Sequence, residues 1–272
     1  MIKFPKKFFN IEDTLFCGQV FRFYPFKRGY VVLSKNKACY LYYEGDFVVL
    51  DSTDDDYFYN YFDLALCYEK IYEKAKSFKV DFLTKATENG KGIRILKQDI
   101  YEVIFSFIIS QNNNIPRIKR LIEGLCEKLG EKFTAFGSEF YAFPSLEKLS
   151  GQTEEFYLGL GFGYRAKYFV RTSKFLVESN FINEIKALST NEICCKLLSL
   201  YGVGKKVADC ILLFGFSKTD SFPVDTWIEK IYYENFNGVL ATREKISQYF
   251  VDLFGDCSGY IQQYLFYYKR GK

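Results

Sequence analysis

The stretch that decides the fold is Leu197-Leu198-Ser199-Leu200-Tyr201-Gly202-Val203-Gly204-Lys205-Lys206-Val207-Ala208-Asp209-Cys210-Ile211. Its pattern predicts one helix that ends at Gly202 and another that begins by Gly204. Glycines on either side of Val203 allow a tight reversal, because glycine accepts a positive φ. The free N–H groups of the second helix then form a phosphate site, so this hairpin (Gly202, Val203, Gly204) would grip a DNA backbone without reading sequence. The alternative is an ordinary helix–helix turn, because short glycine-rich patterns recur by chance.

Two lysines follow the hairpin, and helical spacing gives each of them a partner four residues on. Lys205 faces Asp209, and we expect a surface ion pair between them. Lys206 faces Cys210 and lies beside the apolar face of the helix. Partial burial turns a lysine into a nucleophilic amine, which can displace a base at a sugar C1′ and leave a Schiff base. A solvated lysine is the alternative that spacing alone favours.

The segment Ser221-Phe222-Pro223-Val224-Asp225-Thr226-Trp227 carries the second chemical group. Asp225 stands where a helix would begin, and we expect it to be the N-cap. The same carboxylate could stabilise positive charge on a sugar or help to manage the lysine proton. The two roles do not compete.

The composition excludes several kinds of catalytic and metal-binding site. The chain has 272 residues, a net charge of +4 and no histidine, which removes the usual general base, the serine–histidine triad and histidine–metal sites. None of its 8 cysteines forms a C-x-x-C pair, so we expect no zinc or iron–sulfur site and no metal held by side chains. No segment resembles a signal peptide or a membrane span. We therefore expect free thiols in a reducing cytoplasm. Separately, we expect a monomer of prokaryotic type.

Periodicity predicts an α+β protein. Residues 20–23, 30–33, 38–43 and 47–50 are strand-like and separated by turn signals, which indicates an antiparallel sheet. The acidic run Asp54-Asp55-Asp56 looks like a helix start. We place an N-terminal sheet domain with a flanking helix at 1–95 and a larger helical domain at 96–272.

Several helix starts and one helix stop are visible in the second part. Asp99 can cap a helix over the apolar run 103–109, and Gln111-Asn112-Asn113-Asn114 breaks it. Asn114 and Pro116 open the next helix, with Gly130 as its stop. The other predicted starts are Arg165, Thr190 (for a helix running to Leu200), Thr242 and Ser258.

Six sequence blocks carry a family resemblance. They are Lys206-Val207-Ala208-Asp209-Cys210, Pro223-Val224-Asp225, Gly161-Phe162-Gly163-Tyr164-Arg165-Ala166, Ser110-Gln111-Asn112-Asn113-Asn114-Ile115-Pro116-Arg117, Phe143-Pro144-Ser145-Leu146 and Cys17-Gly18-Gln19-Val20-Phe21-Arg22. Together they resemble the eukaryotic-type 8-oxoguanine DNA glycosylases of the helix-hairpin-helix (HhH-GPD) superfamily, in the right order over nearly the whole chain. The resemblance implies a glycosylase with lyase activity that acts on double-stranded DNA containing 8-oxoguanine.

The resemblance assigns the residues at the reacting base. Lys206 is implied as the nucleophile and Asp225 as its partner, while the Gly18 carbonyl would accept a hydrogen bond from the lesion. Oxidation turns the guanine N7 from an acceptor into a donor, so that one carbonyl favours the lesion over normal guanine. Gln262 and Phe266 are four residues apart on the last helix; Gln262 would hold the Watson–Crick edge of the base and Phe266 would stack on it. Cys210 would cover the other face of the base, and a thiolate there beside the ammonium would form a dipole.

The resemblance also assigns the residues that face the opposite strand. Asn112 would fill the gap left by the flipped base and Tyr164 would wedge the stack. Arg117 and Arg165 would donate to the orphaned cytosine, which predicts a preference for cytosine opposite the lesion. We expect no cofactor, and a cation that bridges the hairpin carbonyls and a DNA phosphate stays an open alternative.

Two positions depart from the family pattern, and three alternatives stay open. Trp227 stands where many relatives carry a histidine, which puts a phosphate or water contact in doubt, and Gln111 replaces a small residue. The first alternative is an endonuclease III-like glycosylase, whose usual C-terminal four-cysteine cluster is missing here. An alkylation-specific glycosylase needs no Schiff-base lysine. A non-enzymatic DNA-binding module would explain the hairpin but not Lys206 with Asp225.

Overall fold

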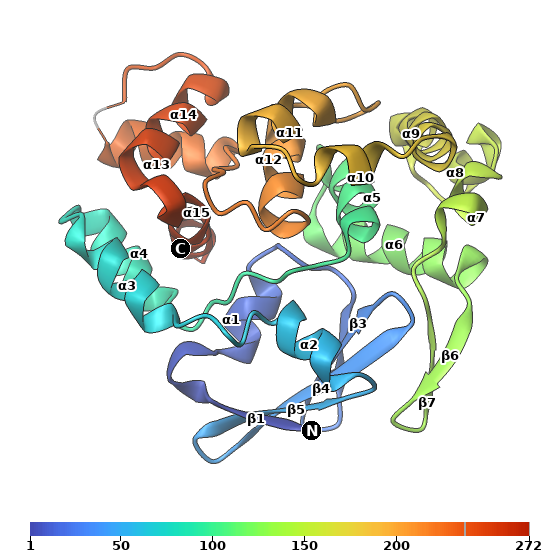
Figure 1. Cartoon of the computed structure of the whole chain (residues 1–272), viewed down its shortest axis with the longest axis horizontal. Helices are drawn as coiled ribbons and strands as arrows, with labels where there is room; N and C mark the ends of the chain where they lie inside the picture. The colour runs from blue at the N-terminus through green and yellow to red at the C-terminus, as the bar shows by residue number, and fades with distance from the viewer. Residues whose placement is uncertain (237, 272) are drawn as a thin grey trace.

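The computed structural model describes residues 1–236 and 238–271 and confirms the α+β class. An antiparallel sheet in the order β1-β5-β4-β3-β2 lies at one end of the molecule, with most helices beyond it (Figure 1). Its strands are β1 (Ile2–Pro5), β2 (Phe23–Phe26), β3 (Gly29–Ser34), β4 (Lys37–Glu44) and β5 (Phe47–Ser52).

The first predicted strand was placed too early, and β1 was missed. Residues 20–22 are not in the sheet. The Phe21 ring packs against Phe107, and Arg22 forms a 3.0 Å ion pair with the buried Glu102 of the helical part. Residues 21–22 therefore join the sheet to the helices.

The two faces of the sheet are covered by different elements. On one face lie α1 (Ile11–Phe16) and α2 (Asp55–Tyr61), the latter capped by Asp54 as the acidic run predicts. On the other face packs the hairpin of β6 (Lys132–Ala135) and β7 (Ser138–Tyr141), which the sequence did not reveal.

The remaining helices form the body. They are α3 (Tyr68–Ser77), α4 (Asp81–Asn89), α5 (Ile100–Ser110), α6 (Ile115–Leu129), α7 (Leu146–Ser150), α8 (Glu154–Gly159), α9 (Ala166–Glu178), α10 (Phe181–Ile185), α11 (Thr190–Leu197), α12 (Lys205–Phe214), α13 (Thr226–Asn235), α14 (Arg243–Phe254) and α15 (Ser258–Arg270). Asp99, Asn114, Asp225 and Thr242 cap their helices as predicted. The cap of α11 is instead Ser189, which forms a capping box with Glu192, and this helix stops at Leu197.

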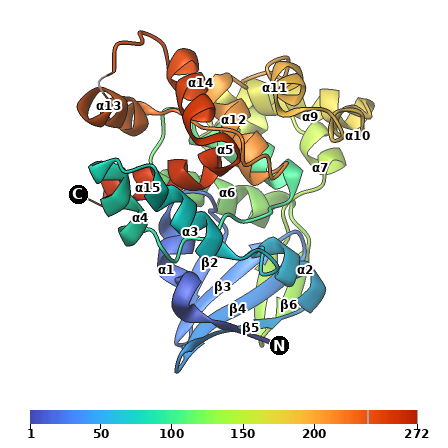
Figure 2. The ribbon, with the colours of Figure 1, turned by 60° about the vertical axis from the view of Figure 1, so that its left-hand side comes forward.

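The body has two apolar cores. One is built mainly on α5, α6, α9 and α12. The other joins α3 and α4 to α13, α14 and α15, and Figures 1 and 2 show α3 and α4 alongside α15. The domain boundary at residue 95 stays a prediction, but segment 68–89 on its N-terminal side shares a core with the C-terminal helices.

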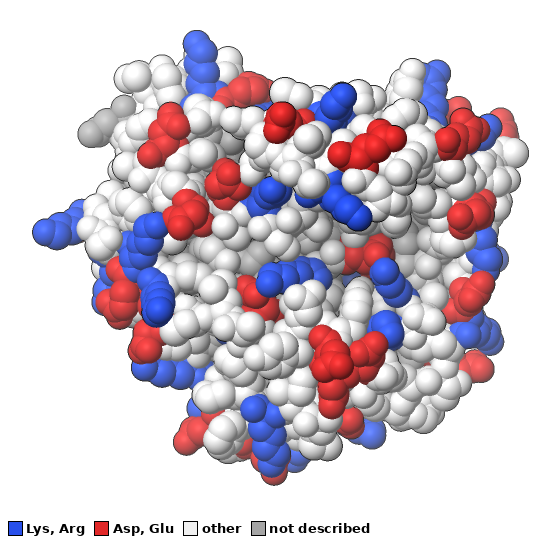
Figure 3. Space-filling view, in the orientation of Figure 1, with Lys and Arg blue, Asp and Glu red and all other residues white. Residues whose placement is uncertain are grey.

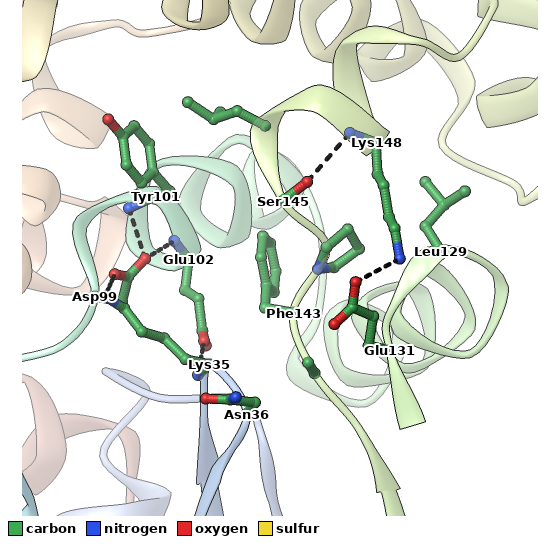
Figure 4. Close-up of a pocket in the computed structure, with 13 residues that line it drawn as sticks. Lys35, Asn36, Asp99, Tyr101, Glu102, Leu129, Glu131, Phe143, Ser145 and Lys148 are labelled. Atoms are coloured by element: carbon green, nitrogen blue, oxygen red, sulfur yellow. Dashed lines mark hydrogen bonds and ion pairs between the residues drawn. The ribbon is translucent and has the colours of Figure 1, made fainter. Parts of the chain in front are cut away.

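A cavity of about 280 Å³ lies between the sheet and the body, where α5 meets the segment that leads into α7 (Figure 4). Its charged residues are already paired: Lys35 contacts Asp99 at 3.0 Å and Lys148 contacts Glu131 at 3.2 Å. Glu102 is held by Arg22. We therefore interpret this cavity as a gap left where the sheet packs against the helical body.

Among the described residues, none of the helices combines the length and apolarity that a membrane crossing requires. The same residues contain no cluster of three or more cysteine and acidic side chains that could hold a metal ion. On the face shown in Figure 3, basic and acidic side chains are interspersed rather than gathered into one basic patch.

Candidate active site

The predicted hairpin is present between α11 and α12. Gly202 has φ +80°, and a Cβ at this position would lie 2.6 Å from the Tyr168 ring, so only glycine fits. Val203 is buried beneath the turn, and Gly204 is the N-cap of α12 with no side-chain hydrogen bond to the helix terminus. The first N–H groups of α12 are therefore left without a side-chain acceptor, as a phosphate site requires.

Lys206 and Asp225 line the same cavity, although they come from different helices. This inner cavity, of about 40 Å³, is lined by Gly18, Phe107, Lys206, Cys210, Phe214, Pro223, Asp225, Gln262, Gln263 and Phe266. The Lys206 Nζ lies 5.2 Å from the centre of the Phe107 ring. Asp225 accepts hydrogen bonds from the N–H groups of Trp227 and Ile228 through Oδ1, both at 3.0 Å, so it caps α13 while facing the lysine's cavity.

All four residues predicted to hold the lesion base line this inner cavity. Gly18 has φ +86°, and a Cβ there would lie 3.4 Å from Phe266 and 3.1 Å from Arg270 Nη1. The positive φ and the closeness of Arg270 favour glycine here, whereas the contact with the Phe266 ring would be an ordinary one. Gln262 is 4% exposed, and its Nε2 donates to the Pro223 carbonyl at 3.1 Å.

The sequence leaves the ionisation state of Cys210 open, and its surroundings bear on it. Burial raises the pKa of its thiol to about 11, although the neighbouring Lys206 ammonium acts in the opposite direction. Burial thus favours the thiol form of Cys210 over the thiolate that a thiolate–ammonium dipole requires. Its place at the wall of the inner cavity is compatible with packing on one face of a base.

The Lys205–Asp209 pair forms at 2.5 Å, but it is not a surface pair. The Asp209 side chain is only 3% exposed and lies near the Ser247 hydroxyl. Burial raises the pKa of the Asp209 carboxyl to about 6, with Lys205 opposing that rise. Helical spacing predicts the pairing, but it could not show that α14 covers the carboxylate.

The predicted wedge residue Asn112 lies in a loop whose backbone carbonyls accept hydrogen bonds from Arg165. Asn112 is exposed and has φ +44°, an uncommon conformation for a residue other than glycine. Arg165 is only 3% exposed and donates to the carbonyls of Gln111 and Asn112. The Tyr164 hydroxyl also donates to the Gln111 carbonyl, and the Gln111 side-chain amide donates to the hairpin carbonyl of Gly202 at 2.8 Å. Wedge loop and hairpin are thus tied together.

A larger open cavity of about 1040 Å³ joins most of these parts. Gly18, Asn112, Gly204, Lys206, Asp225 and Phe266 are all in its lining. Arg117, Tyr164 and Arg165 are not in that lining; Arg117 is exposed and donates to the Gly161 carbonyl at 3.2 Å. The sequence missed Gln263 and Arg270, whose only signal was their place on the same helix as Gln262 and Phe266.

Two family models match the chain. The model described as "8-oxoguanine DNA glycosylase, N-terminal domain" matches residues 1–104, and the model described as "HhH-GPD superfamily base excision DNA repair protein" matches residues 105–254. The second match alone covers the hairpin, Lys206 and Asp225.

Curated relatives have corresponding names. A probable N-glycosylase/DNA lyase of Methanothermobacter thermautotrophicus is 33% identical over 229 residues, which are 77% of this chain and 71% of the relative. An N-glycosylase/DNA lyase of Arabidopsis thaliana is 34% identical over 189 residues, which are 65% of this chain and 52% of the relative.

The whole fold has a solved counterpart. The 8-oxoguanine glycosylase/lyase of Clostridium acetobutylicum, in complex with double-stranded DNA containing cytosine opposite 8-oxoguanine, superposes with a TM-score of 0.90. The two are 38% identical, and the match covers 97% of this chain and 93% of the other.

Proposed function

We propose that this chain, which belongs to the N-glycosylase/DNA lyases of the HhH-GPD superfamily of base excision DNA repair proteins, is a bifunctional 8-oxoguanine DNA glycosylase and apurinic-site lyase. The single observation that carries the proposal is the inner cavity. It brings Lys206 from α12 and Asp225 from the start of α13 to the same space as Gly18, Cys210, Gln262 and Phe266.

The chemistry follows from an amine beside a carboxylate. As the Lys206 Nζ forms a bond to C1′ of the flipped nucleotide, the glycosidic bond breaks and the base leaves with its electron pair. The nitrogen that has bonded to C1′ gives up a proton, and the departing base takes one up. The Asp225 carboxylate stabilises the positive charge that develops on the sugar. Ring opening gives the Schiff base, and loss of a C2′ proton then expels the 3′-phosphate and cuts the strand.

Recognition of the oxidised base would rest on the Gly18 carbonyl. It accepts a hydrogen bond from N7–H of 8-oxoguanine, whereas normal guanine would present an acceptor to an acceptor. The inner cavity holds about 40 Å³, which is space for a few water molecules and not for a purine. A base would therefore have to widen the inner cavity or occupy the adjoining larger cavity as well, whose lining also includes Gly18, Lys206, Asp225 and Phe266.

Base flipping requires a group that replaces the lost stacking, and Asn112 is the exposed residue at the tip of the wedge loop. We assign the wedge to Asn112 and Tyr164, and the reading of the orphaned cytosine to Arg117 and Arg165. Arg165 can read a base only by giving up carbonyls that it holds in the free protein, whereas Arg117 has one long bond to exchange.

The DNA backbone would be held at the hairpin by Gly202, Val203 and Gly204. A cation between the hairpin and a phosphate would need main-chain carbonyls as ligands. The Gly202 and Leu200 carbonyls each accept one hydrogen bond, from the Gln111 side chain and the Val203 N–H, and each keeps a second lone pair that could contact a cation; we derive no step from one. We further propose that the chain acts as a monomer on the DNA of a prokaryotic-type cytoplasm.

The deciding experiment is borohydride trapping on a panel of duplexes. The wild type should form a covalent adduct with 8-oxoguanine opposite cytosine, faster than opposite the other three bases, and should leave thymine glycol intact. Lys206→Gln should form no adduct while still binding the duplex. Normal trapping by Lys206→Gln would refute the assignment, and thymine glycol as the preferred substrate would favour the endonuclease III-like alternative.

A further inference from the structure

Gln111, one of the two positions that depart from the family pattern, ends α5 and reaches the hairpin with its side chain. Its Nε2 donates to the Gly202 carbonyl at 2.8 Å and to the Ile108 carbonyl at 3.1 Å. A carbonyl can only accept, so the nitrogen of the amide, and not its oxygen, must face these two groups. The nitrogen carries two protons, and both are used. It is therefore committed to protein backbone and is not free to contact DNA.

The main chain of the same residue is held by a different element. The Gln111 carbonyl accepts from the Arg165 guanidinium, through Nε at 3.1 Å and through Nη2, and from the Tyr164 hydroxyl at 3.2 Å. Arg165 also donates to the carbonyl of the next residue, Asn112, at 3.0 Å. Gln111 thus connects the hairpin, through its side chain, with the turn that precedes α9, through its backbone.

Asn112 is a residue that needs such support. It has φ +44°, and a residue other than glycine keeps a positive φ only where the surrounding contacts hold it. Its own side chain is exposed, so the conformation depends on the residues on either side of it. Asn113 donates to the Ile109 carbonyl at 3.1 Å, which is a local bond to the end of α5. Gln111 instead supplies a bond to a partner 91 residues away in the chain.

We propose that Gln111 is a positioning residue, which keeps the loop of residues 111–114 in register with the hairpin, so that Asn112 enters the base stack where the lesion leaves it. The inference rests on the proposed function, because it takes Asn112 as the wedge and the hairpin as the phosphate site. Once a DNA strand is held at the hairpin, its base stack has a fixed place, because the strand itself sets the spacing from phosphate to base. A loop bonded to the Gly202 carbonyl meets that place without a search.

The proposal gives Gln111 a part in one step of the reaction and none in two others. Gln111 is not in the lining of the inner cavity, where Lys206 and Asp225 lie, so its loss should leave the chemical step intact. The N–H groups at the start of α12 do not bond to Gln111, so its loss should also leave phosphate binding intact. The step that depends on Gln111 is extrusion of the base, because the lost stacking must be replaced at that moment.

The experiment compares the wild type with Gln111→Met, a variant of similar length without a donor, on two duplexes under single-turnover conditions. One duplex contains 8-oxoguanine opposite cytosine, and the other contains a ready-made abasic site opposite cytosine, which has no base to extrude. We expect Gln111→Met to excise 8-oxoguanine roughly 10-fold more slowly and to cut the abasic duplex at the wild-type rate. Its Kd for undamaged duplex at a fixed salt concentration should match that of the wild type. The fluorescence of a 2-aminopurine beside the lesion should show slower opening of the stack.

Gln152→Met is the matched control, because Gln152 Nε2 also donates to a backbone carbonyl, that of Lys148 at 3.1 Å, but Gln152 lines neither the inner nor the larger cavity. It should keep the wild-type rates on both duplexes. If Gln111→Met does not give a cooperative melting transition, Gln111→Glu replaces it, because it exchanges the donor nitrogen for an oxygen of the same reach.

The proposal requires a loss that is confined to the lesion duplex. Equal losses on both duplexes, a loss confined to the abasic duplex, or wild-type rates on both overturn it. A Kd weakened as much as the excision rate would place Gln111 in DNA binding and would also overturn it. A wild type that excises no 8-oxoguanine instead overturns the proposed function.

Discussion

At the scale of single residues, the one carboxylate of Asp225 has a structural role and a proposed chemical role. It is the N-cap of α13 and lines the cavity of Lys206, where we propose that it stabilises charge in the reaction. Asparagine caps a helix as well as aspartate does but has no negative charge. The two roles can therefore be separated by two substitutions at one position.

We expect Asp225→Asn to lower the rate of base excision by about 100-fold or more, because it removes the charge that faces the sugar. Its melting temperature should stay close to that of the wild type. Asp225→Ala should lose the same activity and also about 1 kcal/mol of stability, because the cap is lost. Single-turnover excision and thermal melts check both. An Asp225→Asn protein with wild-type excision would limit Asp225 to capping.

The sequence predicted the residues around the reaction better than the contacts that hold them. Helical spacing placed Gln262 and Phe266 on one face, and both line the inner cavity. The hydrogen bond from Gln111 to the Gly202 carbonyl could not be foreseen, because its partners lie 91 residues apart in the chain. The buried state of Arg165 was hidden for the same reason, since its acceptors belong to the loop after α5.

At the scale of elements, the hairpin depends on two glycines for different reasons. Gly202 has a positive φ and no room for a Cβ, whereas Gly204 has φ −92° and nothing within 4 Å of a Cβ. Gly202 is therefore required by the fold. Gly204 is required only if a phosphate must approach the backbone closely.

We expect Gly202→Ala to lower the free energy of unfolding by about 2 kcal/mol or more, because the strained φ adds to a clash with Tyr168. Gly204→Ala should fold normally but bind duplex DNA more weakly, because its methyl group stands at the phosphate site. Denaturant unfolding and DNA titration at a fixed salt concentration distinguish them. Wild-type affinity in Gly204→Ala would show that the phosphate contacts the hairpin elsewhere.

Helix α12 contains a buried carboxyl group that titrates in an accessible range. Burial raises the pKa of Asp209 to about 6, above the value of about 3.9 expected in the unfolded chain. The folded state thus binds this proton more tightly, so the contribution of Asp209 to stability is fully present below about pH 4. It is lost as the pH rises through 6.

Asp209→Asn removes this titration while it keeps an acceptor for Lys205. Between pH 4 and pH 7 the wild type should lose up to about 3 kcal/mol of stability relative to the variant. Denaturant unfolding across this range gives the difference directly. A wild type that gains stability over the variant with rising pH would mean that the ion pair with Lys205 outweighs burial.

The starts of helices were predicted correctly where a capping side chain next to the helix determines them. Asp99, Asn114 and Thr242 cap helices through their own side chains, which a sequence displays. The segment 20–22 alternates like a strand but leaves the sheet, because Phe21 and Arg22 find partners in the helical body. Strand β1 was missed because it is short and is defined by its pairing with β5.

At the scale of the whole molecule, the C-terminal helices pack against the N-terminal part of the chain. Helices α3 and α4 lie within the first ninety residues, yet their apolar faces are buried against α13, α14 and α15. Tyr267 on α15 also donates to Asp13 on α1 at 2.7 Å. The helix that carries Gln262, Gln263 and Phe266 is therefore held by the N-terminal part of the chain, and so is the shape of the base pocket.

We therefore expect that cutting the chain at the predicted domain boundary removes more than the sheet, because α3 and α4 are lost as well. The fragment 96–272 keeps the hairpin and every side chain of the reaction, but it exposes the face of α15 that α3 and α4 cover. Because large exposed apolar patches are not stable in a monomer, we expect this fragment to bind a hydrophobic dye and to melt without a cooperative transition. The matched fragment 66–272 restores α3 and α4 and should regain part of the transition. A 96–272 fragment that melted cooperatively at the temperature of the full chain would show that α15 keeps its fold without α3 and α4.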